Sequence, residues 1–214
     1  MDMQTGWNEN RALLRGTAAA EPVLSHETHG VVYETFPLAV RRLSGSEDRV
    51  NVLVPRALLE QRPVTEGMEL EVEGEVRSFN NKSGHGSRLV ITLYARALRP
   101  GDGEPVNDLT LAGVLCKPPV LRRTPLGRDI CDLMLAVNRR YGRTDYLPCI
   151  AWGSLARRCA ELAPGNRVEL EGRLQSRVYT KRLGETSEER TAFEVSVSVL
   201  ERLDAPAPAE QPCG

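Results

Sequence analysis

Basic side chains gather in the second half of this chain, and their type suits the binding of phosphate groups. Residues 105–204 carry 16 Lys and Arg against 13 Asp and Glu, whereas residues 1–103 carry 12 against 14. A guanidinium group offers a fork of donors that matches a phosphate, and it can also stack on a base. This chemistry favours recognition of a polyanion. The candidate basic residues are Arg122, Arg123, Arg139, Arg143, Arg173, Arg177 and Lys181.

Strands with a period of two are predicted to position these residues. Apolar and polar residues alternate through four segments of the second half, at 109–115, 131–137, 168–174 and 193–199. Successive side chains of a strand point to opposite faces, so Arg173 and Arg177 share the face opposite Leu174. The two arginines are therefore expected on one outer surface.

The order of the elements identifies a fold for the second half. A fifth strand is expected at 145–152, and a short helix at 154–162 because Leu155, Cys159 and Leu162 fall on one helical face. The result is three strands, a helix, and two strands joined by a long hairpin loop at 179–190. This is the topology of an OB-fold, a small Greek-key barrel.

The chain also repeats itself at a spacing near 100 residues, which is the size of a small domain. Leu38-Ala-Val-Arg-Arg42 recurs 97 residues later as Leu135-Ala-Val-Asn-Arg139. Polar residues match at this offset or one residue more, Asp48 with Asp145 and Ser78 with Ser176. The first copy shows the same order, with strands at 11–17, 31–42, 49–55, 68–78 and 88–98 and a helix at 56–61. We therefore predict an all-β chain of two tandem OB-folds, five-stranded Greek-key barrels with a short helix between strands 3 and 4.

Composition sets the boundaries of the two copies. The segment 99–108 contains the run RPGDGEP and is expected to be a linker, because Pro and Gly interrupt both helix and strand. It separates an N-terminal barrel at 1–98 from a C-terminal barrel at 109–203. Residues 204–214 contain three prolines and no large apolar residue, which indicates a flexible tail.

The cysteines and the apolar runs indicate a compartment. The five cysteines form no CxxC pair, and Cys131 and Cys149 lie in apolar strand-like runs, as buried reduced thiols do. An odd cysteine count, no signal peptide and no apolar run near the ~18 residues of a membrane span predict a cytoplasmic protein. No cofactor or metal is expected, because nothing near His26 and His29 completes a four-ligand set.

Four segments of the second copy resemble the bacterial single-stranded DNA-binding protein family. They are LAGVLCKPP at 111–119, LMLAVNR at 133–139, DYLPCIAWGSLA at 145–156 and GNRVELEGRLQSR at 165–177. The resemblance implies binding of single-stranded DNA without sequence preference, in replication, recombination or repair, and therefore association with the nucleoid. It further implies that basic side chains hold the phosphates and that the bases stack on aromatic rings. By position it assigns stacking roles to Tyr146, Trp152 and Tyr179, and more loosely to Tyr141.

The first copy lacks these rings. At the equivalent positions stand Arg49, Pro55 and Asn81. We interpret the first copy as a degenerate barrel that serves assembly, or that contacts DNA weakly through Arg77, Lys82 and Arg88, with Phe79 and Tyr33 as partial substitutes for the rings. The resemblance further implies a homodimer presenting four barrels. Residues 207–214 hold one acidic residue where the family carries an acidic tip, which favours a specialised paralogue or a primosome-type relative.

Three other functions are open to different degrees. Catalysis is disfavoured, because the glutamates of 69–75 alternate along a strand as a solvated face and the three histidines form no catalytic set. A protein-interaction module of a replication-restart complex, with weak affinity for DNA, is the alternative that the acidic first half favours. RNA could replace DNA as the ligand, because stacking accepts either nucleic acid.

Overall fold

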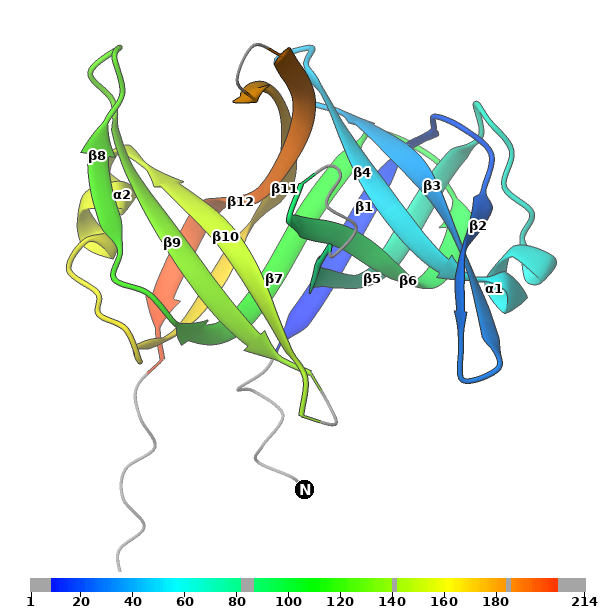
Figure 1. Ribbon diagram of the computed structural model, residues 1–214, viewed down its shortest axis with the longest axis horizontal. Helices are drawn as coiled ribbons and strands as arrows, with labels where there is room; N and C mark the ends of the chain where they lie inside the picture. The colour runs from blue at the N-terminus through cyan, green and yellow to red at the C-terminus, as the bar shows by residue number, and fades with distance from the viewer. Residues whose placement is uncertain (1–8, 82–86, 140–141, 184–185, 204–214) are drawn as a thin grey trace, which may run out of the picture.

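The computed structural model describes residues 9–81, 87–139, 142–183 and 186–203, and it consists of two β-barrels joined side by side (Figure 1). The first barrel contains β1 Asn10–Ala18, β2 Val23–Thr28, β3 Val31–Arg41, β4 Glu47–Pro55, α1 Arg56–Gln61, β5 Glu69–Asn80 and β6 Leu89–Pro100. The second contains β7 Val106–Leu115, β8 Val120–Arg123, β9 Asp129–Asn138, β10 Thr144–Trp152, α2 Gly153–Cys159, β11 Arg167–Leu183 and β12 Thr186–Arg202.

The pairing of the strands confirms the predicted class and fold. All described strands belong to one sheet in the order β2-β3-β4-β6-β5-β1-β7-β11-β12-β10-β9-β8. Each barrel closes on itself through a second pairing of its first strand, β1 with β3 and β7 with β9. The only parallel pairings among the described strands are β4 with β6 and β10 with β12. These are two tandem Greek-key barrels, each with a helix after its middle strand.

The alternation read from the sequence produces the core. Buried apolar side chains of both barrels form one connected cluster, in which equivalent positions such as Val52 and Cys149 are almost completely buried. Glycine is required where β5 and β11 bulge against their partner strands. A Cβ at Gly74 would lie 2.1 Å from the carbonyl oxygen of Tyr94, and a Cβ at Gly172 would lie 2.3 Å from that of Ser196.

The two barrels meet through their first strands, which lie side by side at the centre of Figure 1. β1 pairs with β7 in antiparallel register, from Asn10 opposite Leu111 to Arg15 opposite Val106. The predicted linker at 99–108 is therefore too long, because β6 continues to Pro100 and β7 begins at Val106. The predicted domain limits at 98 and 109 fall inside strands. The chain segment that links the last strand of the first barrel to the first strand of the second is only residues 101–105.

Three details of the predicted secondary structure were wrong. The segment 179–190 is a continuation of the β11–β12 hairpin, whose pairing reaches Leu183 opposite Thr186, and it is not a long loop. Each barrel also has one short strand that the periodicity did not predict, β2 and β8, because the side chains of both are exposed throughout and show no alternation. The helix predicted at 154–162 is shorter, Gly153–Cys159.

Two other expectations concern cysteines and membranes. Cys131, Cys149 and Cys159 are buried free thiols and Cys116 is exposed, whereas Cys213 and the tail at 204–214 lie outside the described residues. Within the described ranges, neither helix has the length and apolar content to cross a bilayer.

Candidate nucleic-acid interface

Strand β10 presents two aromatic rings on its outer face. Tyr146 and Trp152 differ by an even number of positions along the strand, so both point away from the core while Leu147 and Cys149 point into it. Tyr146 is 50% exposed and Trp152 is 41% exposed, which is uncommon for rings of this size. Each ring is therefore open to stack against a planar ligand.

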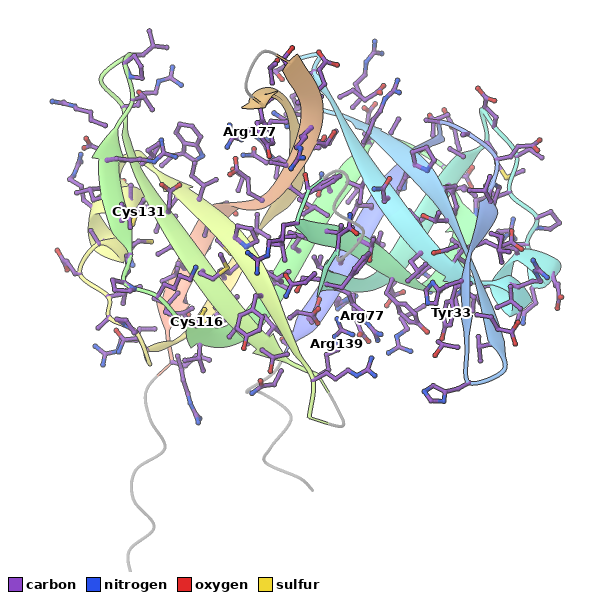
Figure 2. The ribbon with its side chains drawn as sticks, in the orientation of Figure 1. Tyr33, Arg77, Cys116, Cys131, Arg139 and Arg177 are labelled. Carbon is purple, nitrogen blue, oxygen red and sulfur yellow. The ribbon has the colours of Figure 1, made fainter. Side chains whose placement is uncertain are left out.

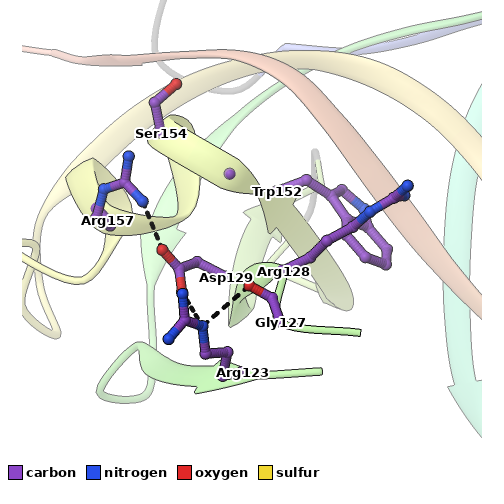
Figure 3. A pocket seen from close by; sticks show the side chains of 8 residues that line it. Arg123, Gly127, Arg128, Asp129, Trp152, Ser154 and Arg157 are labelled. Atoms are coloured by element: carbon purple, nitrogen blue, oxygen red, sulfur yellow. Dashed lines mark hydrogen bonds and ion pairs between the residues drawn. The ribbon is translucent and has the colours of Figure 1, made fainter. Parts of the chain in front are cut away.

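A hollow of about 560 Å³ lies beside Trp152, between the end of β10, the start of α2 and the β8–β9 turn (Figure 3). Its lining is mainly basic, since it includes the three arginines Arg123, Arg128 and Arg157 and a single carboxylate, that of Asp129. Arg157 Nη1 donates to Asp129 Oδ2 at 2.5 Å, and Arg123 Nε lies 3.6 Å from Asp129 Oδ1. The hollow thus combines an exposed ring with a net positive charge.

Sequence reasoning missed two residues of this hollow. Arg128 follows the turn glycine Gly127, and Arg157 lies one helical turn after Gly153. Neither stands in a strand, so the alternation argument that selected Arg173 and Arg177 did not apply to them. The local signal was available, because both positions are basic and flank segments that already contained candidate residues.

The β11–β12 hairpin carries a second group. Arg173, Gln175, Arg177 and Tyr179 alternate along β11, and the guanidinium carbon of Arg177 lies 5.9 Å from the centroid of the Tyr179 ring. This contact confirms that alternate residues of the strand share one surface. Arg173 and Arg177 are exposed, and the hairpin that holds Arg177 rises beside the junction of the barrels (Figure 2).

Three of the predicted arginines already have carboxylate partners. Arg122 binds Asp132 through two nitrogens, and Arg123 approaches Asp129. Arg139 binds Asp145, which is fully buried, and lies at the junction of the barrels in Figure 2. The charges of Arg122 and Arg123 are partly neutralised but exposed, whereas that of Arg139 is engaged inside the protein.

The remaining predicted residues fall into two classes. Arg143 is exposed, and its guanidinium has no hydrogen-bond or ion-pair partner among the described residues, although its carbonyl oxygen accepts from the N–H of Arg139. Tyr141 and the side chain of Lys181 lie outside the described part of the structure, so their roles stay predictions. The structure therefore brings together Trp152 with the basic hollow and Tyr179 with Arg177, and it places Tyr146 separately near the barrel junction.

The outer face of the first barrel is built differently. The ring of Tyr94 lies under two guanidinium groups, those of Arg77 at 3.9 Å and Arg96 at 4.7 Å from its centroid. Both arginines also bind Glu75. Tyr33, labelled in Figure 2, packs between Tyr94 and His26. These rings and charges already satisfy one another, unlike the exposed rings of β10.

The comparisons with known proteins agree with this division. A sequence model of the Single-strand binding protein family matches residues 106–203, which is the second barrel. A single-stranded DNA-binding protein of Thermus thermophilus is 31% identical over 229 residues, covering 92% of this chain and 84% of its own length. One from Thermus aquaticus is 30% identical over 228 residues, with 92% and 84% covered.

A solved structure extends the likeness to both barrels. The crystal structure of the wild-type single-stranded DNA-binding protein from Thermus aquaticus superposes with a TM-score of 0.75 at 26% identity. The match covers 95% of this chain and 98% of that one. The similarity in fold therefore includes the first barrel, which the family model does not reach.

Proposed function

Because the chain belongs to the single-strand binding protein family, we propose that it binds single-stranded DNA without sequence preference, chiefly through its second barrel. The observation that carries this proposal is the pair of exposed rings on β10, Tyr146 and Trp152, beside a basic hollow. Stacking on such rings does not read sequence, because every base has a π-face. Binding modules of this kind need no catalytic group.

We revise the set of proposed contacts from the geometry of the second barrel. Tyr146, Trp152 and Tyr179 are proposed to stack on bases, and exposed arginines to hold phosphates. We add Arg128 and Arg157 to that group because they line the hollow beside Trp152. We remove Arg139, because its guanidinium is bound to a buried carboxylate. The proposed phosphate contacts are Arg122, Arg123, Arg128, Arg143, Arg157, Arg173, Arg177 and Lys181.

The first barrel is proposed to serve mainly assembly. Its equivalents of the stacking positions include Arg49 and Pro55, and the rings of Tyr33 and Tyr94 pack against their neighbours, although Phe79 is 51% exposed. We further propose that two chains associate to present four barrels, and that the protein acts in replication, recombination or repair. Sedimentation of the full chain tests the association directly.

A titration with labelled dT oligonucleotides, followed by fluorescence anisotropy, tests the function. Trp152→Ala should weaken binding by roughly 5- to 150-fold, since stacking contributes about 1–3 kcal/mol per base. Tyr94→Ala is the matched control and should change affinity by less than about twofold, because its ring is covered. Affinity should fall with salt at a log–log slope of about −0.7 per phosphate contact.

Each result of the titration distinguishes the proposed function from an alternative. A wild-type chain that does not bind dT at low salt would point to the interaction module of a replication-restart complex. Binding that is insensitive to salt would contradict the arginine contacts. Tighter binding of rU than of dT at equal length would make RNA the preferred ligand.

A further inference from the structure

The first half of β10 lacks a second partner strand in its own barrel. β10 pairs with β9 along its whole length, from Thr144 to Trp152, but with β12 only at Cys149 and Ile150. The other edge of β10 near Tyr146 faces the first barrel, where β5 ends. Backbone N–H groups at that edge therefore need partners from outside the barrel.

Ser78 of β5 supplies that partner. Its Oγ accepts a hydrogen bond from the backbone N–H of Tyr146 at 2.8 Å, and its own N–H donates to Asp145 Oδ1 at 2.5 Å. Arg139 completes the contact by donating to the carbonyl oxygen of Ser78 at 3.2 Å. Ser78 is 8% exposed and Asp145 is 0% exposed, so these bonds form inside the protein. The backbone that carries the Tyr146 ring is thus held by a residue of the other barrel.

The two barrels exchange this contact reciprocally. Ser176 of β11 accepts from the N–H of Arg49 at 3.1 Å, and its N–H donates to Asp48 Oδ1 at 2.8 Å. Asp48 is itself bound by Arg42, as Asp145 is by Arg139. The bonds of serine with aspartate and with the strand N–H are the same on both sides, but among the described residues only Arg139 also reaches the carbonyl oxygen of the opposite serine. The residue held is also different. Ser78 holds a strand with an exposed ring, whereas Ser176 holds one with an exposed arginine that pairs with Glu47.

We propose that Ser78 is a positioning residue for the DNA interface of the second barrel, so that the first barrel helps to complete a site whose three proposed stacking rings belong to the second. This inference rests on the proposed binding of single-stranded DNA. Without the hydroxyl, the Tyr146 N–H loses its partner and the strand edge is free to shift. Binding must then order the strand and the ring together, which lowers affinity.

Five variants of the full chain test this inference, one of them Tyr146→Ala alone. Ser78→Ala removes the acceptor, Ser78→Thr keeps it, and Ser176→Ala removes the equivalent bond in the other direction. The double variant Ser78→Ala with Tyr146→Ala completes a double-mutant cycle with the single variants. Affinity for labelled dT is measured by anisotropy well below each melting temperature. Amide hydrogen exchange without DNA follows peptides that cover 144–148 and 47–51.

The expected results separate positioning from general loss of structure. Ser78→Ala should weaken binding about fivefold to tenfold, which is the scale of one lost internal hydrogen bond, and Ser78→Thr should stay within about twofold of wild type. Ser78→Ala should have little further effect once Tyr146 is alanine. Amide hydrogen exchange should rise at 144–148 in Ser78→Ala and at 47–51 in Ser176→Ala. The affinity of Ser176→Ala for dT should be nearly unchanged.

Three outcomes would overturn the inference. They are unchanged affinity in Ser78→Ala, equal losses in the two serine variants, and a full Ser78→Ala effect in the Tyr146→Ala background. If Trp152→Ala weakens binding while Ser78→Ala does not, the proposed function stands and the inference alone fails. If the wild type does not bind dT, both fail, whatever the exchange data show for the strand.

Discussion

Two arginine–aspartate pairs of the second barrel have the same chemistry in opposite environments. Arg139 binds Asp145 with the two side chains 19% and 0% exposed, whereas Arg122 binds Asp132 with 51% and 41% exposed. Removing the cation from a buried pair leaves an uncompensated charge in the interior. Removing it from an exposed pair leaves a carboxylate that water solvates. Their different environments predict different roles, one structural and one available to a ligand.

Arg139→Ala should therefore lower the free energy of unfolding by about 3–5 kcal/mol, and Arg122→Ala by less than about 1 kcal/mol. Urea unfolding followed by circular dichroism measures both. Arg122→Ala should weaken the salt dependence of dT binding instead. Similar losses of stability in the two variants would contradict the assignment of Arg139 to the barrel junction.

At the scale of elements, the row of glutamates along strand β5 forms ion pairs with arginines of the neighbouring strands. It is not the solvated face that the sequence predicted. Arg15 donates to Glu71 from the neighbouring strand, and Arg99 reaches both Glu71 and Glu73 from β6. The hydrogen bonds from Arg15, which outweigh the opposing effect of burial, hold the pKa of Glu71 below its usual value. The sequence showed alternating glutamates, but their arginine partners come from other strands and could not be read locally.

This row of glutamates predicts acid sensitivity with a defined sign. A carboxyl with a depressed pKa in the folded protein contributes stability above its unfolded pKa of about 4.3, and that contribution is lost as the pH falls through the folded pKa. Glu71→Gln should lower Tm at pH 7, and the gap from wild type should close between about pH 4.5 and pH 3. Glu66→Gln, on an exposed turn, should follow wild type throughout. A gap that is constant with pH would exclude the Glu71 carboxylate as its cause.

The elements that could be predicted are those whose burial alternates. The strands around Leu38 and Leu135 followed the repeat and the period of two, and the two helices followed them in order. β2 and β8 could not be predicted, because exposed side chains leave no periodic signal. The length of the β11–β12 hairpin was missed for a related reason. Its tip pairs only with itself, so Val178 is 65% exposed and no core face marks the strand.

The candidate site also contains features that could be predicted from the sequence and features that could not. Tyr146 and Trp152 could be assigned to the strand expected at 145–152 through the resemblance, and the structure leaves both rings exposed. The repeat in the sequence showed the matches of Asp48 with Asp145 and of Ser78 with Ser176. It did not show which contacts these residues make. Each aspartate binds the serine of the opposite copy, and a repeat within one chain does not reveal contacts between its copies.

On the scale of the whole molecule, the two barrels share one continuous sheet and one connected core. β1 lies between β5 and β7, so the central strand of the junction has hydrogen-bonded neighbours from both barrels. The buried aspartates Asp48 and Asp145 add polar contacts across the same junction. A barrel that unfolded alone would expose these carboxylates and leave backbone groups of the other barrel without partners. The barrels should therefore unfold together.

A cavity placed in the first barrel should consequently destabilise the second. Val52→Ala removes buried methyl groups from the first core and should cost about 2 kcal/mol. In a Trp7→Phe background, Trp152 is the remaining tryptophan and its fluorescence reports the second barrel. Its urea midpoint should fall in Val52→Ala as it does in Cys149→Ala, the equivalent cavity in the second core, and circular dichroism should give the same midpoint. If Val52→Ala leaves the Trp152 transition in place while circular dichroism becomes biphasic, the barrels unfold independently, and the junction positions two autonomous domains instead of uniting them.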